Sequence, residues 1–257
     1  MIKNLSEKNL EVLKKNGFII VEKALDKDQV SVWKEKIYSL YNGQKYEINN
    51  TVGNVAFEKL LEIEPHLSRE LIGHKSVAPY LKYFLGKQCQ LRSLRAHINP
   101  GTYLQEWHMD FYDYWYQQES SKANVPLKGL CMNTTFYLTD NTPEKGRLRF
   151  LTEFLDKPTP EDLRIHAHYT DDRKNLFQTW CDDQKYIDLY PMAGDVIIFF
   201  SHIPHQGAKL VEDEEHSPRA NIVLHYQQNP MFPDINFVSD PQFTLDQLGY
   251  AGTFPFK

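Results

Sequence analysis

The sequence predicts an α+β domain in which helices come first and an antiparallel β-core follows. Helical spacing of apolar residues dominates residues 1–87, whereas short alternating or β-branched runs separated by turn signals dominate residues 88–230. The chain has 257 residues, 41% of them hydrophobic, which is enough for a sizeable core. We therefore expect residues 1–257 to form a single domain. Its core would be a double-stranded β-helix (a jelly-roll or cupin-like double sheet) flanked by N-terminal helices, with a C-terminal tail at 231–257.

The N-terminal part carries clear start and stop signals. Ser6 and Asp26 are suitable N-caps, Gly17 ends the first helical pattern, and Pro79 interrupts the last one. The polar segment 44–60 is expected to be irregular. The predicted elements are helices at 5–15, 27–42 and 67–85 and a strand at 18–21.

The β-core follows from alternation and from turn residues. Asn99-Pro100-Gly101 is a turn signal directly after an alternating run. Residues 153–185 are charged and broken by prolines, which predicts an excursion over the surface or a lid. The predicted strands are 90–98, 129–138, 196–200 and 219–226.

Composition excludes several classes of function. A net charge of -5 without a basic stripe gives no electrostatic reason to bind nucleic acid or an anionic membrane surface. The 3 cysteines are widely spaced, which argues against a disulfide framework and a zinc knuckle. The N-terminus has no apolar signal region, and the apolar run Val196–Phe200 is too short to span a bilayer. We expect a cytoplasmic protein.

A possible metal site lies in Gln105-Glu106-Trp107-His108-Met109-Asp110. In an extended segment His108 and Asp110 point to the same side, and a second histidine from another strand would complete a two-His, one-carboxylate face that suits Fe(II). The motif is near chance by itself. Its context is Gly194-Asp195, a turn that opens the strand leading to His205. His202 is the rival, and the His-x-Gly pattern favours His205.

Other residues give this motif weight. Aromatic side chains follow it at Phe111, Tyr112 and Trp115, as expected for the wall of a small-molecule site. Arg219 opens the last strand, and a guanidinium can hold a carboxylate bidentately. His225 shares strand parity with Arg219, but a core histidine is the favoured interpretation.

At these residues the chain resembles the phytanoyl-CoA dioxygenase-like (PhyH) branch of the Fe(II)/2-oxoglutarate oxygenases. The resemblance runs through most of the chain, and each motif is weak alone. After Leu148 the chain departs from the family's usual Pro-Gly-Ser-His turn. The matching segments are Phe18–Val21 with the Asp26 helix, Pro100-Gly101 with Gln105-x-x-His108-x-Asp110, Phe136–Pro143 with Gly146-Arg147-Leu148, Gly194-Asp195-x-x-x-Phe199, His205-Gln206-Gly207, and Arg219-Ala220.

The resemblance implies a 2-oxoglutarate-dependent non-haem iron dioxygenase that uses Fe(II), 2-oxoglutarate and O2. It implies His108, Asp110 and His205 as iron ligands and Arg219 as the anchor of the distal carboxylate of 2-oxoglutarate. The positions that would also contact the cosubstrate are Ser93, Gln105 and Thr135. Related halogenases vacate the carboxylate position, so Asp110 favours hydroxylation, desaturation or ring formation.

The predicted substrate is a small molecule, such as a specialised metabolite or an amino-acid derivative. Its pocket would include Phe111, Tyr112, Trp115, Trp180 and His202. Two alternatives remain: a non-catalytic double-sheet protein that binds a ligand or partner, and a cupin-like metalloenzyme that does not use 2-oxoglutarate. Only a user of 2-oxoglutarate needs the cation at Arg219.

Overall fold

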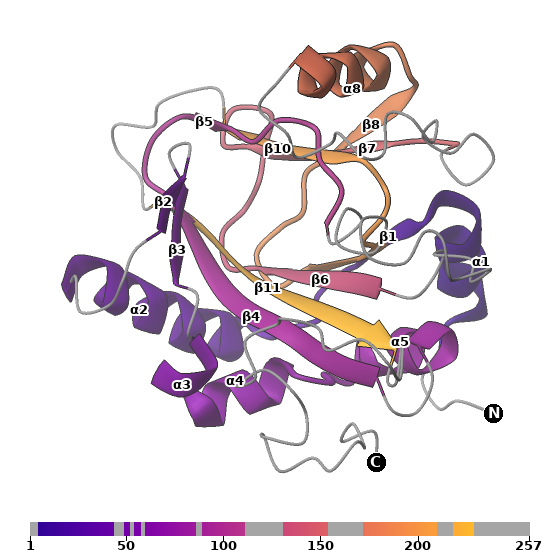
Figure 1. The fold of residues 1–257 in the computed structure, drawn as a ribbon. Coiled ribbons are helices and arrows are strands. Elements are labelled where there is room, and N and C mark those ends of the chain that lie inside the picture. The colour runs from indigo at the N-terminus through magenta and orange to yellow at the C-terminus, as the bar shows by residue number, and fades with distance from the viewer. Residues whose placement is uncertain are drawn as a thin grey trace, which may run out of the picture.

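The structure is a computed structural model that describes residues 5–43, 49–51, 54–57, 60–85, 89–110, 131–153, 172–209 and 218–228. Two antiparallel sheets face each other, and neither closes into a barrel (Figure 1). The larger sheet has seven strands in the order β1-β9-β6-β11-β4-β3-β2, and the smaller has four in the order β5-β10-β7-β8. The predicted mixed fold with a jelly-roll-like double sheet is confirmed.

The strands of the larger sheet are β1 (Phe18–Val21), β2 (Asn49–Thr51), β3 (Asn54–Phe57), β4 (Cys89–Asn99), β6 (Cys131–Tyr137), β9 (Val196–Phe200) and β11 (Arg219–Gln228). The smaller sheet contains β5 (Tyr103–Leu104), β7 (Arg147–Leu151), β8 (Tyr186–Leu189) and β10 (His205–Lys209). The helices are α1 (Glu7–Asn16), α2 (Lys27–Gly43), α3 (Leu60–Ile63), α4 (Pro65–Leu71), α5 (Ala78–Leu85) and α8 (Asp172–Asp182).

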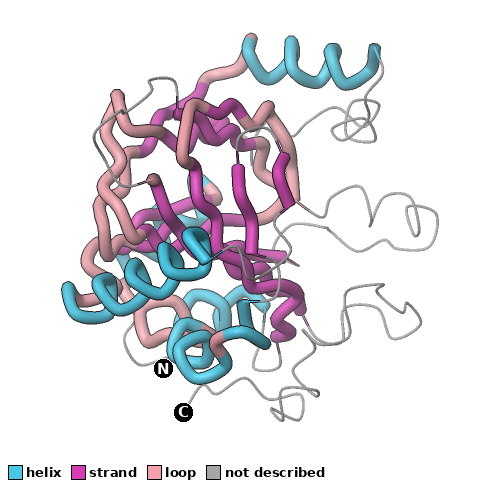
Figure 2. The backbone as a smooth tube through the Cα atoms, turned by 90° about the vertical axis from the view of Figure 1, so that its left-hand side faces the viewer, coloured by secondary structure: helices cyan, strands magenta, loops and turns pink. Residues whose placement is uncertain are grey.

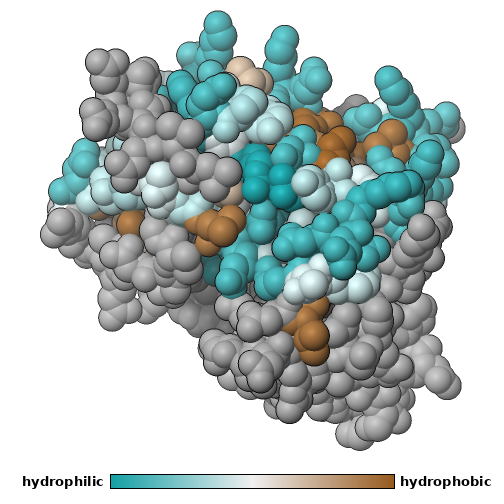
Figure 3. All heavy atoms as spheres, turned by 90° about the horizontal axis from the view of Figure 1, so that it is seen from above, coloured by the Kyte–Doolittle hydropathy of each residue, from teal (hydrophilic) through white to brown (hydrophobic). Residues whose placement is uncertain are grey.

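Helices cover the two sheets unequally. α2, α3, α4 and α5 lie below the larger sheet, and α8 lies above the smaller one (Figure 1). The view turned by 90° shows the same layers, with α8 at one end of the molecule (Figure 2). Among the described residues visible from above, most are hydrophilic, with a few hydrophobic side chains between the polar ones (Figure 3). None of the helices in the described ranges combines the length and the apolar character needed to cross a membrane.

The first two helices form where their capping residues predict. The Oγ of Ser6 accepts a hydrogen bond from the Asn9 amide, and Gly17 ends α1 in the left-handed region at φ 80°. The Asp26 carboxylate accepts from the Gln29 amide at 2.8 Å, and the Gln29 side chain accepts from the Asp26 amide at 3.1 Å. This reciprocal capping starts α2, which buries Trp33, Ile37 and Leu40.

The strand pairing places the central motifs next to one another. β9 is buried along its whole length, because β1 and β6 pair with its two edges and packed layers cover its faces. The turn before β9 is held by Asp195, whose carboxylate accepts hydrogen bonds from the amides of Lys23 and Met192, both at 2.9 Å. Gly194 has φ 94°, and a Cβ there would lie 2.7 Å from the Leu25 carbonyl oxygen.

Several local predictions were wrong. The polar segment expected to be irregular contains β2 and β3, which pair with each other and extend the sheet beyond β4. The third predicted helix is interrupted around Gly73, at φ 66°, and Pro79 lies in the first turn of α5, where its missing N–H costs nothing. His205 begins a separate strand, β10, and does not simply follow the strand at 196–200. The stretch 153–185 includes the helix α8, and its description as a surface excursion or lid stays a prediction.

Candidate active site

Two histidines from distant parts of the chain are paired through their backbones. The His108 amide donates to the His205 carbonyl at 3.0 Å, and the His205 amide donates to the His108 carbonyl at 2.9 Å. The Asp110 amide donates to the Ser201 carbonyl at 2.8 Å. The segment that carries His108 and Asp110 is thus attached to the end of β9 and the start of β10.

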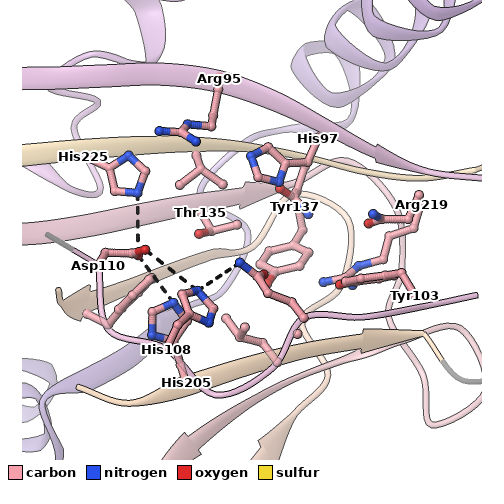
Figure 4. A pocket seen from close by; sticks show the side chains of 17 residues that line it. Arg95, His97, Tyr103, His108, Asp110, Thr135, Tyr137, His205, Arg219 and His225 are labelled. Carbon is pink, nitrogen blue, oxygen red and sulfur yellow. Dashed lines mark hydrogen bonds and ion pairs between the residues drawn. The ribbon is translucent and has the colours of Figure 1, made fainter. Parts of the chain in front are cut away.

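This attachment brings three ligand atoms together (Figure 4). One ligand atom each from His108, Asp110 and His205 lies within 4.8 Å of the others. The Nε2 of His205 is 3.4 Å from Oδ2 of Asp110, and the Nε2 of His108 is 3.8 Å from Oδ1. A divalent metal ion placed between these atoms would be held by two imidazoles and one carboxylate on one face.

The hydrogen bonds around the cluster orient both imidazole rings. The Nδ1–H of His108 donates to the Glu106 carbonyl at 2.8 Å, and the Nδ1–H of His205 donates to the Ile203 carbonyl at 2.9 Å. Nε2 is therefore the ring nitrogen that each histidine turns toward Asp110 and that would bind a metal ion. Burial by itself would raise the pKa of Asp110, but contacts with His205 and His225 outweigh it and hold this pKa well below its usual range. This donor set fits Fe(II).

A second feature of the site is a buried cation. Arg219 is 5% exposed, and its Nη1 donates to the Tyr103 hydroxyl. Its guanidinium lies over the rings of Tyr103 and Tyr137, at 5.4 and 5.7 Å from their centroids. Its Nε is buried and has no hydrogen-bond partner among the described residues. Arg219 thus presents a charged donor that suits an anionic ligand.

One cavity contains both features. It encloses about 640 Å³ including its open mouth, and it lies between the two sheets. Its floor is built from alternate residues of three neighbouring strands, which all point to one face of the larger sheet. These residues are Arg95, His97 and Asn99 of β4, Thr135 and Tyr137 of β6, and Arg219, Asn221, Val223 and His225 of β11.

Two further histidines belong to this floor. Burial, and then the positive charge of Arg95, lower the pKa of His97 to about 3, so its ring is neutral near pH 7. His225 presents its Nε2 to Oδ2 of Asp110 at 3.6 Å, and its Nδ1 is hydrogen-bonded to the Ser93 hydroxyl. Both histidines line the cavity, whereas the sequence favoured a structural role in the core for His225.

Two of the three residues predicted to contact the cosubstrate line the cavity, and the third does not. Gln105 and Thr135 line the cavity. The Gln105 amide nitrogen lies 3.0 Å from Nε2 of His108, on the atom that a metal would need, so this amide must move when metal binds. Ser93 is not among the cavity-lining residues that the structure describes, and its hydroxyl faces His225 instead.

The predicted substrate pocket is only partly within the described chain. Phe111, Tyr112 and Trp115 lie outside the described residues. His202 is buried and stacked on Phe200, with ring centroids 5.7 Å apart, and is not among the described cavity-lining residues. Trp180 packs against Phe177 within α8, also away from the described lining.

The sequence analysis missed several polar residues that line or support the cavity between the His-Asp-His cluster and Arg219. Arg95, Tyr103, Asn133, Tyr137 and Asn221 were not singled out, although strand parity places Asn221 with Arg219 and places Asn133 and Tyr137 with Thr135. Period-2 alternation was therefore the available signal. Tyr103 had no such signal, because β5 is only two residues long.

α8 is joined to the metal-site segment through Trp107. The Trp107 amide donates to Oε1 of Gln178 at 2.9 Å, and Nε2 of Gln178 donates back to the Trp107 carbonyl at 2.8 Å. The indole N–H donates to the Asp182 carboxylate at 2.8 Å. Trp107 directly precedes His108, so α8 buttresses one ligand from outside the cavity.

Several solved structures have a fold similar to that of this chain. The chain is 15% identical to the non-haem α-ketoglutarate-dependent epimerase SnoN from nogalamycin biosynthesis, with a TM-score of 0.64 over 87% of this chain and 82% of that one. It is 18% identical to EctD from S. alaskensis with bound Fe, with a TM-score of 0.66 over 93% and 83%. It is 14% identical to HygX from Streptomyces hygroscopicus with nickel, 2-oxoglutarate and hygromycin B bound, with a TM-score of 0.63 over 90% and 89%. At these identities the likeness is one of fold.

The family of the chain is identified from its sequence. No curated protein matches the chain. Residues 13–210, well over half of the chain, match the family model for phytanoyl-CoA dioxygenase (PhyH). The matched range includes the segment of His108 and Asp110, the strand β6 and His205. The chain therefore belongs to the PhyH family and is a 2-oxoglutarate-dependent non-haem iron oxygenase.

Proposed function

We propose that His108, Asp110 and His205 hold Fe(II) and that Arg219 holds the far carboxylate of 2-oxoglutarate. The observation that carries this proposal is the occurrence of a two-His, one-carboxylate cluster and a buried arginine in one cavity. Bound Fe(II) and 2-oxoglutarate would activate O2 and supply the oxidising power, with succinate and CO2 as coproducts. We further propose that residues 1–257 act as one domain.

The residues of this chain would orient and shield the reaction. Both imidazoles are fixed by their Nδ1–H hydrogen bonds, so they need not rotate to bind metal. Arg219, Tyr103 and Tyr137 would hold the cosubstrate at its distal end. Leu148 and Phe199 close part of the cavity wall and reduce the access of water.

Hydroxylation, or a related oxidation of a small molecule, is the reaction we propose. Asp110 fills the ligand position that halogenation would need open, which supports oxygen chemistry. The described cavity is lined mainly by polar side chains, including Arg95, which suits a substrate with oxygen-rich or acidic groups. HygX has been solved with hygromycin B and EctD with 5-hydroxyectoine, and both are polar small molecules.

The test is anaerobic addition of Fe(II) and 2-oxoglutarate to the metal-free protein. We expect a weak visible charge-transfer band that requires both additions, together with calorimetric binding of 2-oxoglutarate. A panel of polar small acids and their neutral amides, assayed for substrate-stimulated succinate formation, would then identify the substrate class. Absence of both the band and the binding would contradict the oxygenase assignment and favour a non-catalytic binding protein.

A further inference from the structure

A set of buried polar residues surrounds the carboxylate of Asp110. Asn133 is fully buried, and its Nδ2 donates a 2.5 Å hydrogen bond to Oδ2 of Asp110. The Ser201 hydroxyl donates to Oδ1 of Asn133 at 2.7 Å, and Ser201 is 1% exposed. Because an ionised carboxylate can only accept hydrogen bonds, the amide nitrogen of Asn133 must be the atom that faces Asp110, which leaves the amide oxygen to accept from Ser201.

His225 approaches the same carboxylate oxygen from the neighbouring strand. Its Nε2 is 3.6 Å from Oδ2 of Asp110, an electrostatic contact slightly longer than a hydrogen bond. Its Nδ1 is hydrogen-bonded to the hydroxyl of Ser93, directly across the β4–β11 pair. If the serine hydroxyl donates, Nδ1 is an acceptor and Nε2 carries the hydrogen that points to Asp110.

The strand register explains why these residues meet. Asn133 of β6, His225 of β11 and Ser93 of β4 are cross-strand partners in one row. Side chains in such a row project from the same face of the sheet at the spacing of neighbouring strands. The segment of Asp110 lies over this row, because its amide is bonded to the carbonyl of Ser201.

We propose that Asn133 and His225 are positioning residues that hold one oxygen of Asp110, so that this carboxylate binds the metal through its other oxygen only. Ser201 and Ser93 fix the orientations of Asn133 and His225, respectively. A carboxylate free to bind through both oxygens would fill a coordination position that the cosubstrate or oxygen needs. This inference rests on the proposed metal site.

The proposal can be tested with Co(II), whose visible spectrum responds to coordination number and geometry. We would titrate the metal-free protein with Co(II) by calorimetry and record its visible absorption. Removal of a donor in Asn133→Leu or His225→Phe should lower the affinity by roughly 10–100-fold, as is typical when a partner of a metal ligand is lost. The same variants should change the Co(II) spectrum.

Rescue separates positioning from simple packing. His225→Gln keeps an N–H donor at the same number of bonds from the backbone as Nε2 of histidine and should recover most of the parent spectrum, whereas His225→Phe should not. The matched control is Thr134→Val, which removes a fully buried hydroxyl next to Asn133 on the opposite face of β6. Thr134→Val should leave Co(II) affinity and spectrum unchanged.

The outcomes distinguish failure of the proposed metal site from failure of the positioning role of Asn133 and His225. If the parent protein does not bind Co(II), the proposed metal site fails. If the parent binds, and folded Asn133→Leu and His225→Phe proteins show the parent affinity and spectrum, the positioning role is overturned. If His225→Phe does not fold, Ser93→Ala tests this residue instead, because it leaves the His225 ring in place, and an unchanged Co(II) spectrum overturns the role of His225. If Asn133→Leu does not fold, Ser201→Ala tests the other residue, because it removes the hydroxyl that orients the Asn133 amide, and an unchanged Co(II) spectrum overturns the role of Asn133.

Discussion

His108 and His205 form an isolated antiparallel bridge in which each backbone amide donates to the carbonyl of the other residue. Their imidazole centroids are 4.1 Å apart. The bridge fixes the separation of the two side chains through the backbone, before any metal is present. Asp110 needs only its side-chain rotamer to complete the cluster, so the three ligands are preorganised, and only the Gln105 amide has to move away from His108 when metal binds.

Loss of Asp110 should abolish metal binding without unfolding the protein. Asp110→Ala removes the single carboxylate of the cluster, so the fall in Fe(II) affinity should exceed the roughly 10–100-fold that loss of an outer partner costs. The bridge between His108 and His205 does not involve this side chain, and the thermal midpoint of the metal-free protein should be little changed. Calorimetry measures the Fe(II) affinity, and circular dichroism measures the thermal midpoint. Unchanged Fe(II)-dependent turnover would refute the ligand assignment.

Arg219 should determine the affinity for 2-oxoglutarate. Arg219→Leu removes the buried charge, and loss of charge-assisted hydrogen bonds should cost about 3 kcal/mol, or roughly a hundredfold in Kd. Calorimetry on the metal-loaded protein measures this loss. The control is Arg149→Leu, because Arg149 is paired with Asp188 at 2.6 Å and is not among the described cavity-lining residues. An equal loss in both variants would show that the effect is not specific to the site.

Gly207 should be needed for the placement of Tyr103. A Cβ at Gly207 would lie 3.0 Å from the Tyr103 hydroxyl and 3.4 Å from Oε1 of Gln105. Both atoms end flexible side chains, so Gly207→Ala should displace them at little cost in stability but weaken 2-oxoglutarate binding several-fold. Gly101→Ala is the control, because a Cβ there meets nothing within 4 Å. If Gly207→Ala binds 2-oxoglutarate like the parent, Tyr103 does not need its present position.

The three residues of the His-Asp-His cluster could be picked out in the sequence because most of their geometry is local, and their role as iron ligands stays a prediction. Two-residue spacing puts His108 and Asp110 on one side, and the His-x-Gly pattern after the strand that follows Gly194 favours His205 as the second histidine. The supporting residues are harder to predict. The row of Asn133, His225 and Ser93 depends on the register of three strands, and register is set by long-range packing rather than by local sequence. β2 and β3 also escaped prediction, because β2 is a wholly polar edge strand of three residues and β3 is a run of only four residues, too short to show hydrophobic alternation.

The contact between α8 and the metal-site segment should contribute to stability. Gln178→Ala removes two hydrogen bonds to the backbone of Trp107, a residue that is 1% exposed. Leaving this buried amide and carbonyl without partners should cost about 1–3 kcal/mol in the free energy of unfolding, measured with urea. Thr179→Ala, at an exposed position of the same helix, should change it by less than about 0.5 kcal/mol. Equal stability of both variants would mean that α8 does not support this segment.

His97 should make the metal-free protein less stable as the pH falls. Its pKa is about 3 in the folded protein against 6.5 for an ordinary histidine, so between these values the unfolded chain binds the extra proton. The free energy of unfolding therefore decreases as the pH is lowered through this window, by at most about 1.4 kcal/mol per pH unit from this group. Exchange of His97 for asparagine keeps a polar side chain that cannot titrate, so the decline should be shallower in the His97→Asn protein. Urea unfolding of both proteins between about pH 5 and 8 measures the difference. If the free energies of unfolding of the two proteins fall in parallel with pH, the His97 ring is protonated as easily in the folded protein as in the unfolded chain. Burial beside Arg95 would then not lower the pKa of His97.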